Sequence, residues 1–260
     1  MRKNIIFVVL VLMLVVLAAV SAWQVYVPLQ EDVESVRSYK DLTAYVHLPE
    51  ISLLASSSEE GDTMVDEPER AQDALPQVDF AALQAINPDI VGWILIEGTN
   101  INYPVVQGSD NQYYLRHLFT GEYNASGCIF LDSRNTPDFT DQHSILYGHH
   151  MDNGTMFNGL MDYKEQSFFD AHPNALLLTP TGNYRIDFFA GYVADVMSDA
   201  WQVDFGPDEL ATWLQEAKEK SLFASRIEPT AMDRVLTLST CSYEFDNARF
   251  VLYGRLSTLA

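Results

Sequence analysis

The sequence predicts a mixed α/β domain that is built mainly from β-strands, in the form of a β-barrel with helical insertions. Many short apolar runs are separated by turn residues, and one late segment has clear helical spacing. Short strands between regular turn signals are typical of barrels and related all-β architectures. The chain has 260 residues, 48% of them hydrophobic, which is enough for one or two domains with a packed core.

An apolar segment precedes this domain. Residues 4–22 are almost entirely apolar and follow Arg2 and Lys3. A helix of this length crosses the roughly 30 Å hydrocarbon layer of a membrane, and the two cations place the N-terminus in the cytoplasm. A cleaved signal peptide is the alternative, because small residues cluster at 18–22, but the apolar run exceeds the usual ~7–15-residue signal core. We therefore predict a single-pass anchor over residues 1–23, with the remainder of the chain outside the cytoplasm.

Residues 24–77 are predicted to connect this anchor to the folded domain. Residues 31–45 are compatible with a short helix, whereas residues 56–77 are rich in Ser, Glu, Asp and Pro. Such polar, acidic composition is typical of a flexible stalk that holds a domain away from the membrane. The folded domain is accordingly expected over residues 78–260.

The elements of this domain follow from capping residues, periodicity and turns. Residues 80–86 are predicted to be a helix, with Asp79 as its N-cap and Asn87-Pro88 as its end. Residues 207–223 form the clearest helix, because Pro207 and two acidic residues open it and four apolar residues follow at helical spacing. Strands are expected at 90–97, 101–106, 128–131, 144–147, 175–179, 184–193, 235–238 and 250–256, with short helical stretches at 111–118 and 157–163.

Charge and cysteine content exclude some functions. The formal net charge is −21 and the chain has only 15 Lys and Arg, so a nucleic-acid-binding surface is not expected. The two cysteines, Cys128 and Cys241, are able to pair outside the cytoplasm. A domain of this size and apolar content does not need a disulfide, so we expect one buried, inert thiol and one reactive thiol.

Three residues have the chemistry of acyl transfer through a thioester. Cys241 ends the apolar run 238–241, Arg249 lies eight residues later, and His149 lies about ninety residues upstream. A cysteine thiolate is the nucleophile in such a reaction, a histidine carries the proton to the leaving amine, and an arginine stabilises developing negative charge. The polar segment 242–248 suits the turn of a hairpin that would bring Cys241 and Arg249 together. Core packing of Cys241 is the alternative, in which case the chain is a membrane-tethered surface binding protein.

Several separated motifs stand in this chain: Thr237-Leu238-Ser239-Thr240-Cys241 with Arg249 and Gly254-Arg255-Leu256, and the segments 87–93, 101–108, 147–151 and 155–157. With these motifs the sequence resembles the sortases, membrane-anchored cysteine transpeptidases of Gram-positive bacteria, and most of all their class B. The resemblance covers residues 78–256, with the family's motifs in their usual order. It implies an eight-stranded β-barrel with N-terminal helices and a long helix between the sixth and seventh strands, which residues 207–223 match.

The resemblance also implies the function and the site. Cys241 is the nucleophile, with His149 and Arg249 as its catalytic partners, and no metal or cofactor is expected. The implied reaction cleaves a sorting signal after Thr and transfers the protein to an amine. The acceptor is either a lipid-linked peptidoglycan precursor or a pilin lysine, and the lack of a lid motif before the domain favours wall anchoring. Three further residues are expected to line the groove for the sorting signal: Asn111, Leu115 and Ser239.

Other motifs carry weaker hypotheses. The triplet 126–128 is similar to the nucleophile motif of the L,D-transpeptidases, but apolar residues follow Cys128 and the expected His-Gly partner is absent upstream. His150 is expected to be a neighbour of the catalytic histidine. It is a poor joint metal ligand with His149, because adjacent residues on a strand point to opposite faces. The tryptophans are expected in the core, with Trp201 having an alternative place at the rim of a groove.

Overall fold

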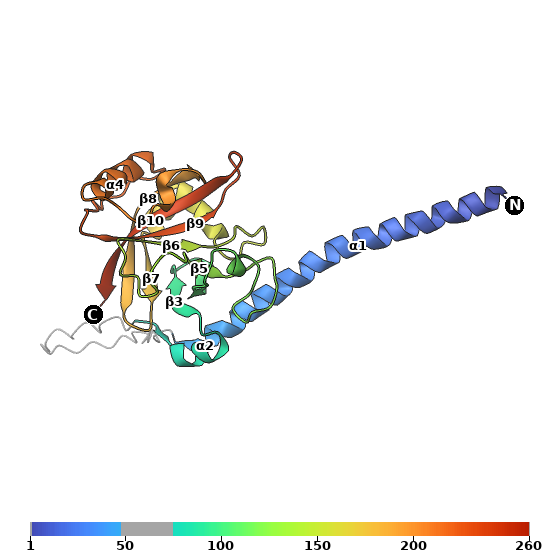
Figure 1. Cartoon of the computed structure of the whole chain (residues 1–260), viewed down its shortest axis with the longest axis horizontal. Helices are drawn as coiled ribbons and strands as arrows, with labels where there is room; N and C mark the ends of the chain where they lie inside the picture. The colour runs from blue at the N-terminus through green and yellow to red at the C-terminus, as the bar shows by residue number, and fades with distance from the viewer. Residues whose placement is uncertain (1, 48–74, 260) are drawn as a thin grey trace, which may run out of the picture.

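A closed barrel of eight strands forms the centre of the protein (Figure 1). The computed structural model describes residues 2–47 and 75–259. Around the barrel the strand order is β10-β8-β7-β3-β4-β5-β6-β9, so the predicted eight-stranded, mainly β architecture is confirmed. In chain order the strands are β3 (Ile90–Leu95), β4 (Asn102–Val106), β5 (Ile129–Leu131), β6 (His143–Tyr147), β7 (Asn174–Leu178), β8 (Asn183–Asp195), β9 (Arg234–Cys241) and β10 (Ala248–Leu259).

Two strand pairings position the functional site. Most neighbouring strands are antiparallel, but β4 pairs with β5 and β6 pairs with β9 in parallel. A parallel pair requires a long connection, and the β6–β9 pair joins segments about ninety residues apart, with Tyr147 opposite Ser239. The antiparallel β9–β10 hairpin places Cys241 opposite Arg249. Residues far apart in the sequence therefore meet at one end of the barrel.

The helices lie in the connections between strands. α2 (Phe80–Ile86) has the predicted bounds, and the Asp79 carboxylate accepts a hydrogen bond of 2.9 Å from the Ala82 amide. α4 (Glu209–Lys220) lies between the sixth and seventh barrel strands as predicted, although it is shorter than 207–223. Its apolar face, including Trp213, is buried against β8 and β10. The other connections contain α3 (Gln166–Ala171), which was not predicted, and the 3-10 turns η1 (Thr43–Tyr45), η2 (Tyr113–Leu115), η3 (Asn158–Lys164) and η4 (Asp199–Trp201).

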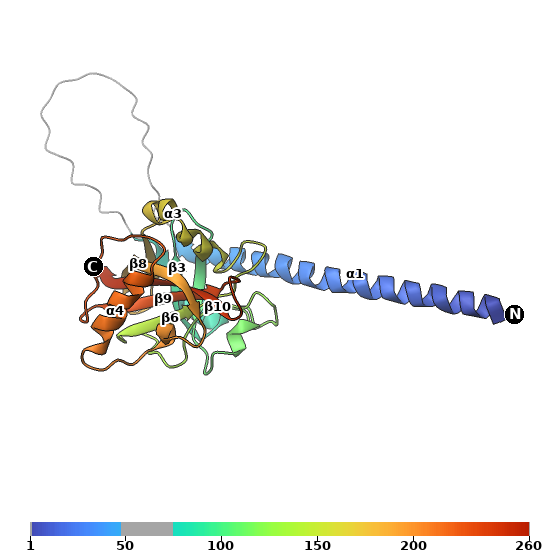
Figure 2. The same cartoon turned by 90° about the horizontal axis from the view of Figure 1, so that it is seen from above.

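Two predicted helices differ from the structure. The stretch 111–118 forms only the three-residue turn η2. The helix expected at 31–45 is the end of α1 (Arg2–Leu42), which is continuous through Pro28 and projects from one side of the barrel (Figures 1 and 2). The predicted anchor at 1–23 and the predicted short helix at 31–45 are thus parts of one helix, although a proline inside a helix removes a hydrogen bond.

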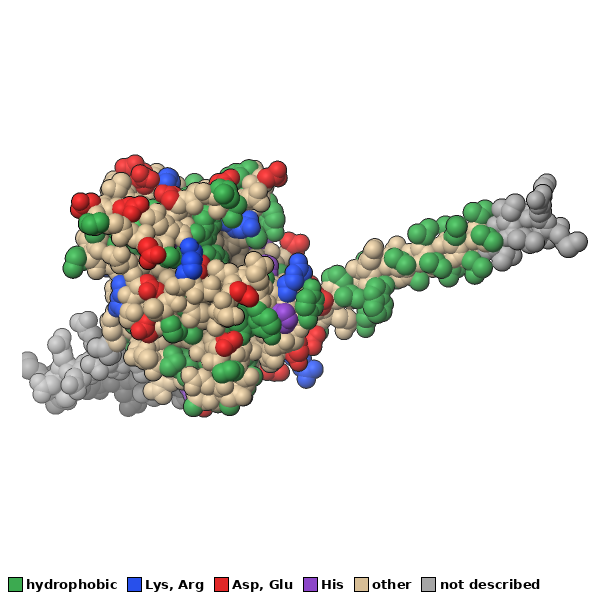
Figure 3. Space-filling view, viewed as in Figure 1, with side chains coloured by type: hydrophobic (Ala, Val, Ile, Leu, Met, Phe, Trp, Pro, Cys, Tyr) green, Lys and Arg blue, Asp and Glu red, His purple; other side chains and the backbone are tan. Residues whose placement is uncertain are grey.

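The projecting part of α1 is apolar. Figure 3 shows hydrophobic side chains along it, whereas Asp and Glu side chains are scattered over the barrel domain. The most apolar stretch of the helix has a mean hydropathy of 2.3 and is long enough to cross a membrane. By length and composition α1 is therefore consistent with a membrane anchor or a signal sequence.

The last turns of α1 belong to the folded body. Tyr39 and Leu42 are buried in the core beside barrel residues. The short strand β1 (Val46–His47) pairs with β2 (Gln77–Val78), which leads into α2. The end of α1 thus joins the body that the sequence places from residue 78 onward. The acidic stalk predicted at 56–77 lies outside the described residues up to residue 74.

Candidate active site

One groove contains every residue that the sequence assigns to the site. It has a volume of about 360 Å³ and lies at the end of β6 and β9. The three proposed catalytic residues and the three proposed substrate-binding residues all line it. Its walls are Asn111, Gln112, Leu115, Phe130, Tyr147, Gly148, His149, Val196, Trp201, Ser239, Thr240, Cys241 and Arg249.

Strand register brings the three proposed catalytic residues together. Beyond the last β6–β9 pair, the Gly148 amide donates a hydrogen bond of 3.1 Å to the Ser239 carbonyl. His149 and Cys241 each come two residues after a paired residue, and strand side chains repeat on one face every two residues. Cys241 is also directly opposite Arg249 on β10, where facing Cβ atoms lie ~4.5–5.5 Å apart.

The backbone before His149 must be glycine. A Cβ atom on Gly148 would lie 2.5 Å from a side-chain carbon of Ile129 and 2.7 Å from the ring of Phe157. The chain therefore passes directly over these apolar groups. The Phe157 amide then donates a hydrogen bond of 2.9 Å to the His149 carbonyl, which fixes the backbone after the turn.

The His149 ring has a defined orientation. Its Nε2 lies 2.8 Å from the carbonyl oxygen of Leu115. A carbonyl only accepts hydrogen bonds, so Nε2 carries a hydrogen and Nδ1 is the nitrogen left to exchange a proton. Leu115 therefore acts twice: it lines the groove and it orients the histidine.

The loop after Cys241 is fastened at several points. The Cys241 side chain is partly exposed, and the Ser242 amide donates a hydrogen bond of 3.0 Å to the Ala248 carbonyl. Glu244 accepts hydrogen bonds from Ser242 and Lys164. Burial opposes the ionisation of Glu244, but these two bonds prevail and lower its pKa to about 2. The strand pairing thus continues into a loop in which Glu244 is paired with Lys164.

His150 lies beside the backbone of the nucleophile. Its Nδ1 is 3.2 Å from the Cys241 carbonyl, and its ring meets Tyr243 edge-on with centroids 5.3 Å apart. The groove is lined by His149 and not by His150. This placement agrees with the expectation that His150 is a neighbour.

A buried carboxylate supports the floor of the groove. The fully buried Asp132 side chain accepts hydrogen bonds from Arg134 at 2.7 and 2.9 Å and from the Tyr147 hydroxyl at 2.8 Å. Burial opposes its ionisation, yet the bonds from Arg134 and Tyr147 lower the pKa of Asp132 to about 2. Arg134 also donates to the Trp201 carbonyl at 3.1 Å, and the Trp201 indole donates to Ser239 Oγ at 3.3 Å. One hydrogen-bond network therefore connects Tyr147 on one side of the groove with Trp201 on the other.

Cys128 is a different kind of thiol. It is fully buried, and both cysteines are free thiols in the structure. Burial raises the pKa of Cys128 to about 12, and Cys128 is not among the residues that line the groove. A protonated, inaccessible thiol does not serve as a nucleophile, so the hypothesis of an L,D-transpeptidase that uses Cys128 is wrong.

Sequence reasoning missed part of the groove. Tyr147 had a usable signal, because it precedes His149 by two residues and so shares its strand face. Trp201 lines the groove, which agrees with the alternative that the sequence analysis gave to a place in the core. Gln112 lies next to Asn111 in a segment that was already expected at the groove. Phe130 and Val196 come from two other segments, and the sequence holds no signal that these segments converge.

A cysteine, a histidine and an arginine that line one groove of a closed barrel are the groups that acyl transfer through a thioester requires. The family model "Sortase domain" matches residues 94–257. The chain is 38% identical to Sortase B of Listeria monocytogenes over 181 residues, which cover 68% of this chain and 73% of that protein. It is also 38% identical to Sortase B of Staphylococcus aureus over 180 residues, covering 68% and 74%.

Solved structures agree with this assignment. The S. aureus sortase B–substrate complex matches with a TM-score of 0.67 and 38% identity, covering 70% of this chain and 85% of that one. A sortase B from Bacillus anthracis matches with a TM-score of 0.64 and 37% identity, covering 69% and 84%. The chain therefore belongs to the sortase B family and is a sortase B-type cysteine transpeptidase.

Proposed function

We propose that this sortase cleaves a sorting signal after its Thr residue, holds the product as a thioester on Cys241, and transfers it to an amine. The convergence of Cys241, His149 and Arg249 in one groove is the observation that carries this proposal. Asn111, Leu115 and Ser239 line the same groove and are proposed to contact the signal. A related S. aureus sortase B has been solved as a substrate complex, which supports the binding of a sorting-signal substrate.

The proposed chemistry gives each of these three residues one role. The Cys241 thiolate attacks the carbonyl carbon of Thr, and the Arg249 guanidinium stabilises the negative charge on the oxygen. His149, with Nε2–H held by the Leu115 carbonyl, gives the proton on Nδ1 to the leaving amine as the peptide bond breaks. The acceptor amine then attacks the thioester, loses a proton to His149, and releases the Cys241 sulfur.

The acceptor and location are proposed as follows. α1 spans the membrane with the N-terminus inside, so the barrel works on the outer side. The acceptor is an amine of a lipid-linked peptidoglycan precursor, which membrane anchoring would bring within reach. A sortase B that is 38% identical to this chain has been solved complexed with triglycine, a short peptide with a free amine, which supports a peptide acceptor.

The test uses the full-length chain in detergent micelles. Wild type, Cys241→Ala and Cys128→Ser are incubated with fluorogenic peptides of the Asn-Pro-x-Thr and Leu-Pro-x-Thr types, with and without an oligoglycine amine. Intact mass spectrometry should show an acyl adduct on wild type and Cys128→Ser, and an amide product when the amine is added. An adduct that persists in Cys241→Ala, or cleavage at another bond, would overturn the proposal.

A further inference from the structure

The end of α1 forms a hydrogen-bonded seam with one loop. Glu31 and Ser35 lie one turn apart and face residues 124–128, which are remote in the sequence. The Glu31 carbonyl accepts a hydrogen bond of 2.8 Å from the Asn124 side chain, and the Ser35 and Ser126 hydroxyls are 3.0 Å apart. Both serines are buried. We call residues 31–39 with loop 124–128 the helix–loop seam.

Tyr39 continues this seam one turn further. Its hydroxyl donates a hydrogen bond to the Gly127 carbonyl and lies 3.2 Å from Cys128 Sγ. The hydroxyl has one hydrogen and the carbonyl can only accept, so the Cys128 thiol must donate to the Tyr39 oxygen. All three groups are buried, where an unmade hydrogen bond costs about 1–3 kcal/mol. The Cys128 thiol thus donates to the Tyr39 hydroxyl, which in turn donates to the Gly127 carbonyl. Only this order of donors and acceptors leaves every group with a partner.

The seam rests directly on the segment that orients His149. The Cys128 amide donates a hydrogen bond of 2.9 Å to the Tyr114 carbonyl. Gly127 has φ +56°, and a Cβ atom on it would lie 2.4 Å from the Tyr114 oxygen and 2.7 Å from the Leu115 oxygen. That Leu115 oxygen is the atom that accepts the hydrogen bond from His149 Nε2. A shift of Gly127 therefore displaces the acceptor of the catalytic histidine.

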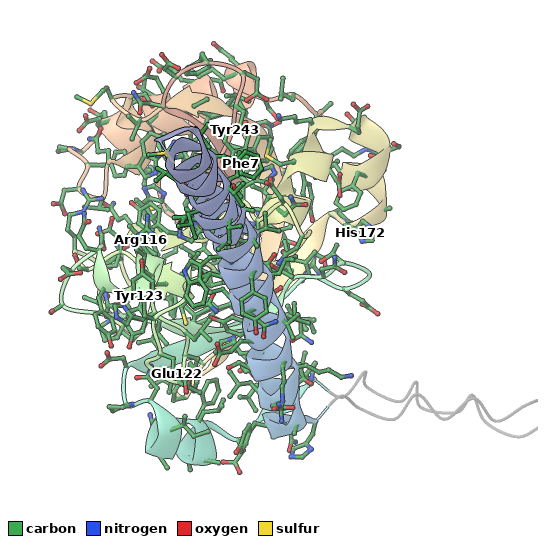
Figure 4. All side chains as sticks on the ribbon, turned by 90° about the vertical axis from the view of Figure 1, so that its right-hand side faces the viewer. Phe7, Arg116, Glu122, Tyr123, His172 and Tyr243 are labelled. Atoms are coloured by element: carbon green, nitrogen blue, oxygen red, sulfur yellow. The ribbon has the colours of Figure 1, made fainter. Side chains whose placement is uncertain are left out.

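The residues around α1 are visible in a view along the helix. Figure 4 looks toward the barrel along α1 and shows Arg116, Glu122 and Tyr123 beside the helix on one side, with His172 on the other. Arg116 follows η2, and its carbonyl accepts a hydrogen bond of 3.0 Å from the Asn124 amide. The helix, the loop and the turn η2 are thus three successive layers beneath one wall of the groove.

We propose that the end of α1, acting through Tyr39, is a positioning element for His149, so that the helix that carries the apolar segment also completes the active site. The proposal rests on the proposed catalytic role of His149. Tyr39 touches neither substrate nor reacting atoms, and it acts by fixing the Leu115 carbonyl. When that carbonyl moves, the imidazole loses its Nε2–H tautomer and orientation, so fewer molecules hold Nδ1 ready for proton transfer. The turnover rate should fall more than substrate binding weakens.

The test compares two buried tyrosine hydroxyls in the full-length chain. Tyr39→Phe removes the donor to Gly127 and keeps the ring. Tyr192→Phe is the matched control, because Tyr192 and Tyr39 are both 6% exposed and the Tyr192 hydroxyl lies 3.1 Å from that of Tyr253. Tyr39→Phe should lower kcat roughly 3- to 10-fold with little change in KM, and Tyr192→Phe less than twofold. Ser35→Ala, one turn earlier, is a milder second variant that should give a smaller loss of kcat.

A spectroscopic readout separates positioning from stability. In ¹⁵N-histidine spectra, Tyr39→Phe should shift the His149 Nε2–H signal toward a mixture of tautomers, and Tyr192→Phe should leave it unchanged. A lower Tm with unchanged kcat and an unchanged His149 signal would show a merely structural role and overturn this proposal. If His149→Gln keeps full activity, the proposed function fails instead, and the His149 signal still tests the seam.

Discussion

The two sides of the groove are held in different ways. Cys241 and Arg249 belong to one hairpin, and β10 pairs along its length with both β8 and β9. His149 follows the short strand β6 and takes its ring orientation from Leu115, on a three-residue turn. The turn η2 contacts the loop 124–128, which is hydrogen-bonded to the end of α1. Continuous strand pairing therefore places the nucleophile, whereas contacts between remote segments place the histidine. Substitution of the reacting residues Cys241 and Arg249 should therefore remove most of the chemistry, whereas substitution of the residues that position His149 should reduce its rate.

The largest expected effect comes from the two cysteines, which have the same chemistry and opposite surroundings. Cys241→Ala should lower acyl-enzyme formation at least about a thousandfold, because none of the other residues described along the groove carries a thiol. Cys128→Ser should keep activity within about threefold, since its thiol is buried and protonated. Thioester trapping and peptide-cleavage rates measure both. An equal loss in the two variants would break the distinction between the two sides.

Arg249 tests the hairpin side next. Arg249→Ala should reduce kcat about 10²–10³-fold, the usual cost of removing a donor to a developing oxyanion. Arg249→Lys should recover only part of this loss, because lysine keeps the charge but not the planar fork. Arg185→Ala is the control, since Arg185 lies on the neighbouring strand β8 and pairs with Asp187. Steady-state kinetics of the three variants test this role. Full activity of Arg249→Ala would show that Arg249 takes no part in the reaction.

The difference between the two sides also explains what the sequence could predict. The segment 238–249 contains an apolar strand, a polar turn and a second strand, so the pairing of Cys241 with Arg249 follows from local patterning. The helix 80–86 was found for the same reason, because Asp79 and Pro88 mark its ends. Local signals of this kind are complete within a few residues of the chain.

Long-range placement left no such signal. Nothing near Leu115 indicates that its carbonyl holds His149, and the stretch 111–118 was expected to be a helix. From the sequence, Tyr39 is one residue of a short helix in the linker. Its hydrogen-bond partners lie about ninety residues later in the chain, so nothing nearby indicates that it is buried. These features depend on contacts that only the folded chain makes.

Asp132 tests whether the groove itself depends on a buried charge. The pKa of Asp132 is lowered from 3.8 to about 2, so its ionised form stabilises the folded state by about 2 kcal/mol at neutral pH. This contribution is present above pH ~4 and is lost as the pH falls toward 2. Asp132→Asn should therefore lower Tm by roughly 5 °C at pH 7, with a difference from wild type that shrinks below pH 4.

The control for this prediction is Asp208→Asn, which changes an exposed carboxylate before α4. Thermal unfolding from pH 3 to 8 should show no comparable pH dependence for it. Asp132→Asn should also raise KM more than it lowers kcat, because Tyr147 and Trp201 lose a common support while the hairpin stays paired. A constant Tm difference at all pH values would mean that packing, and not charge, explains the effect.

The smallest effect is expected at Glu244, where the hairpin side carries an exposed ion pair. The side chains of Glu244 and Lys164 are 41% and 27% exposed, and exposed pairs contribute only about 0–1 kcal/mol. The loop keeps its backbone bond from Ser242 to Ala248 when the pair is removed. Glu244→Gln should change kcat about twofold or less and lose most of its effect at 1 M salt. Glu216→Gln, which breaks the exposed pair with Lys220 on α4, is the control for kcat. A tenfold loss in Glu244→Gln alone would show that the loop after the nucleophile depends on this ion pair, and strand pairing would then no longer explain how Cys241 is held.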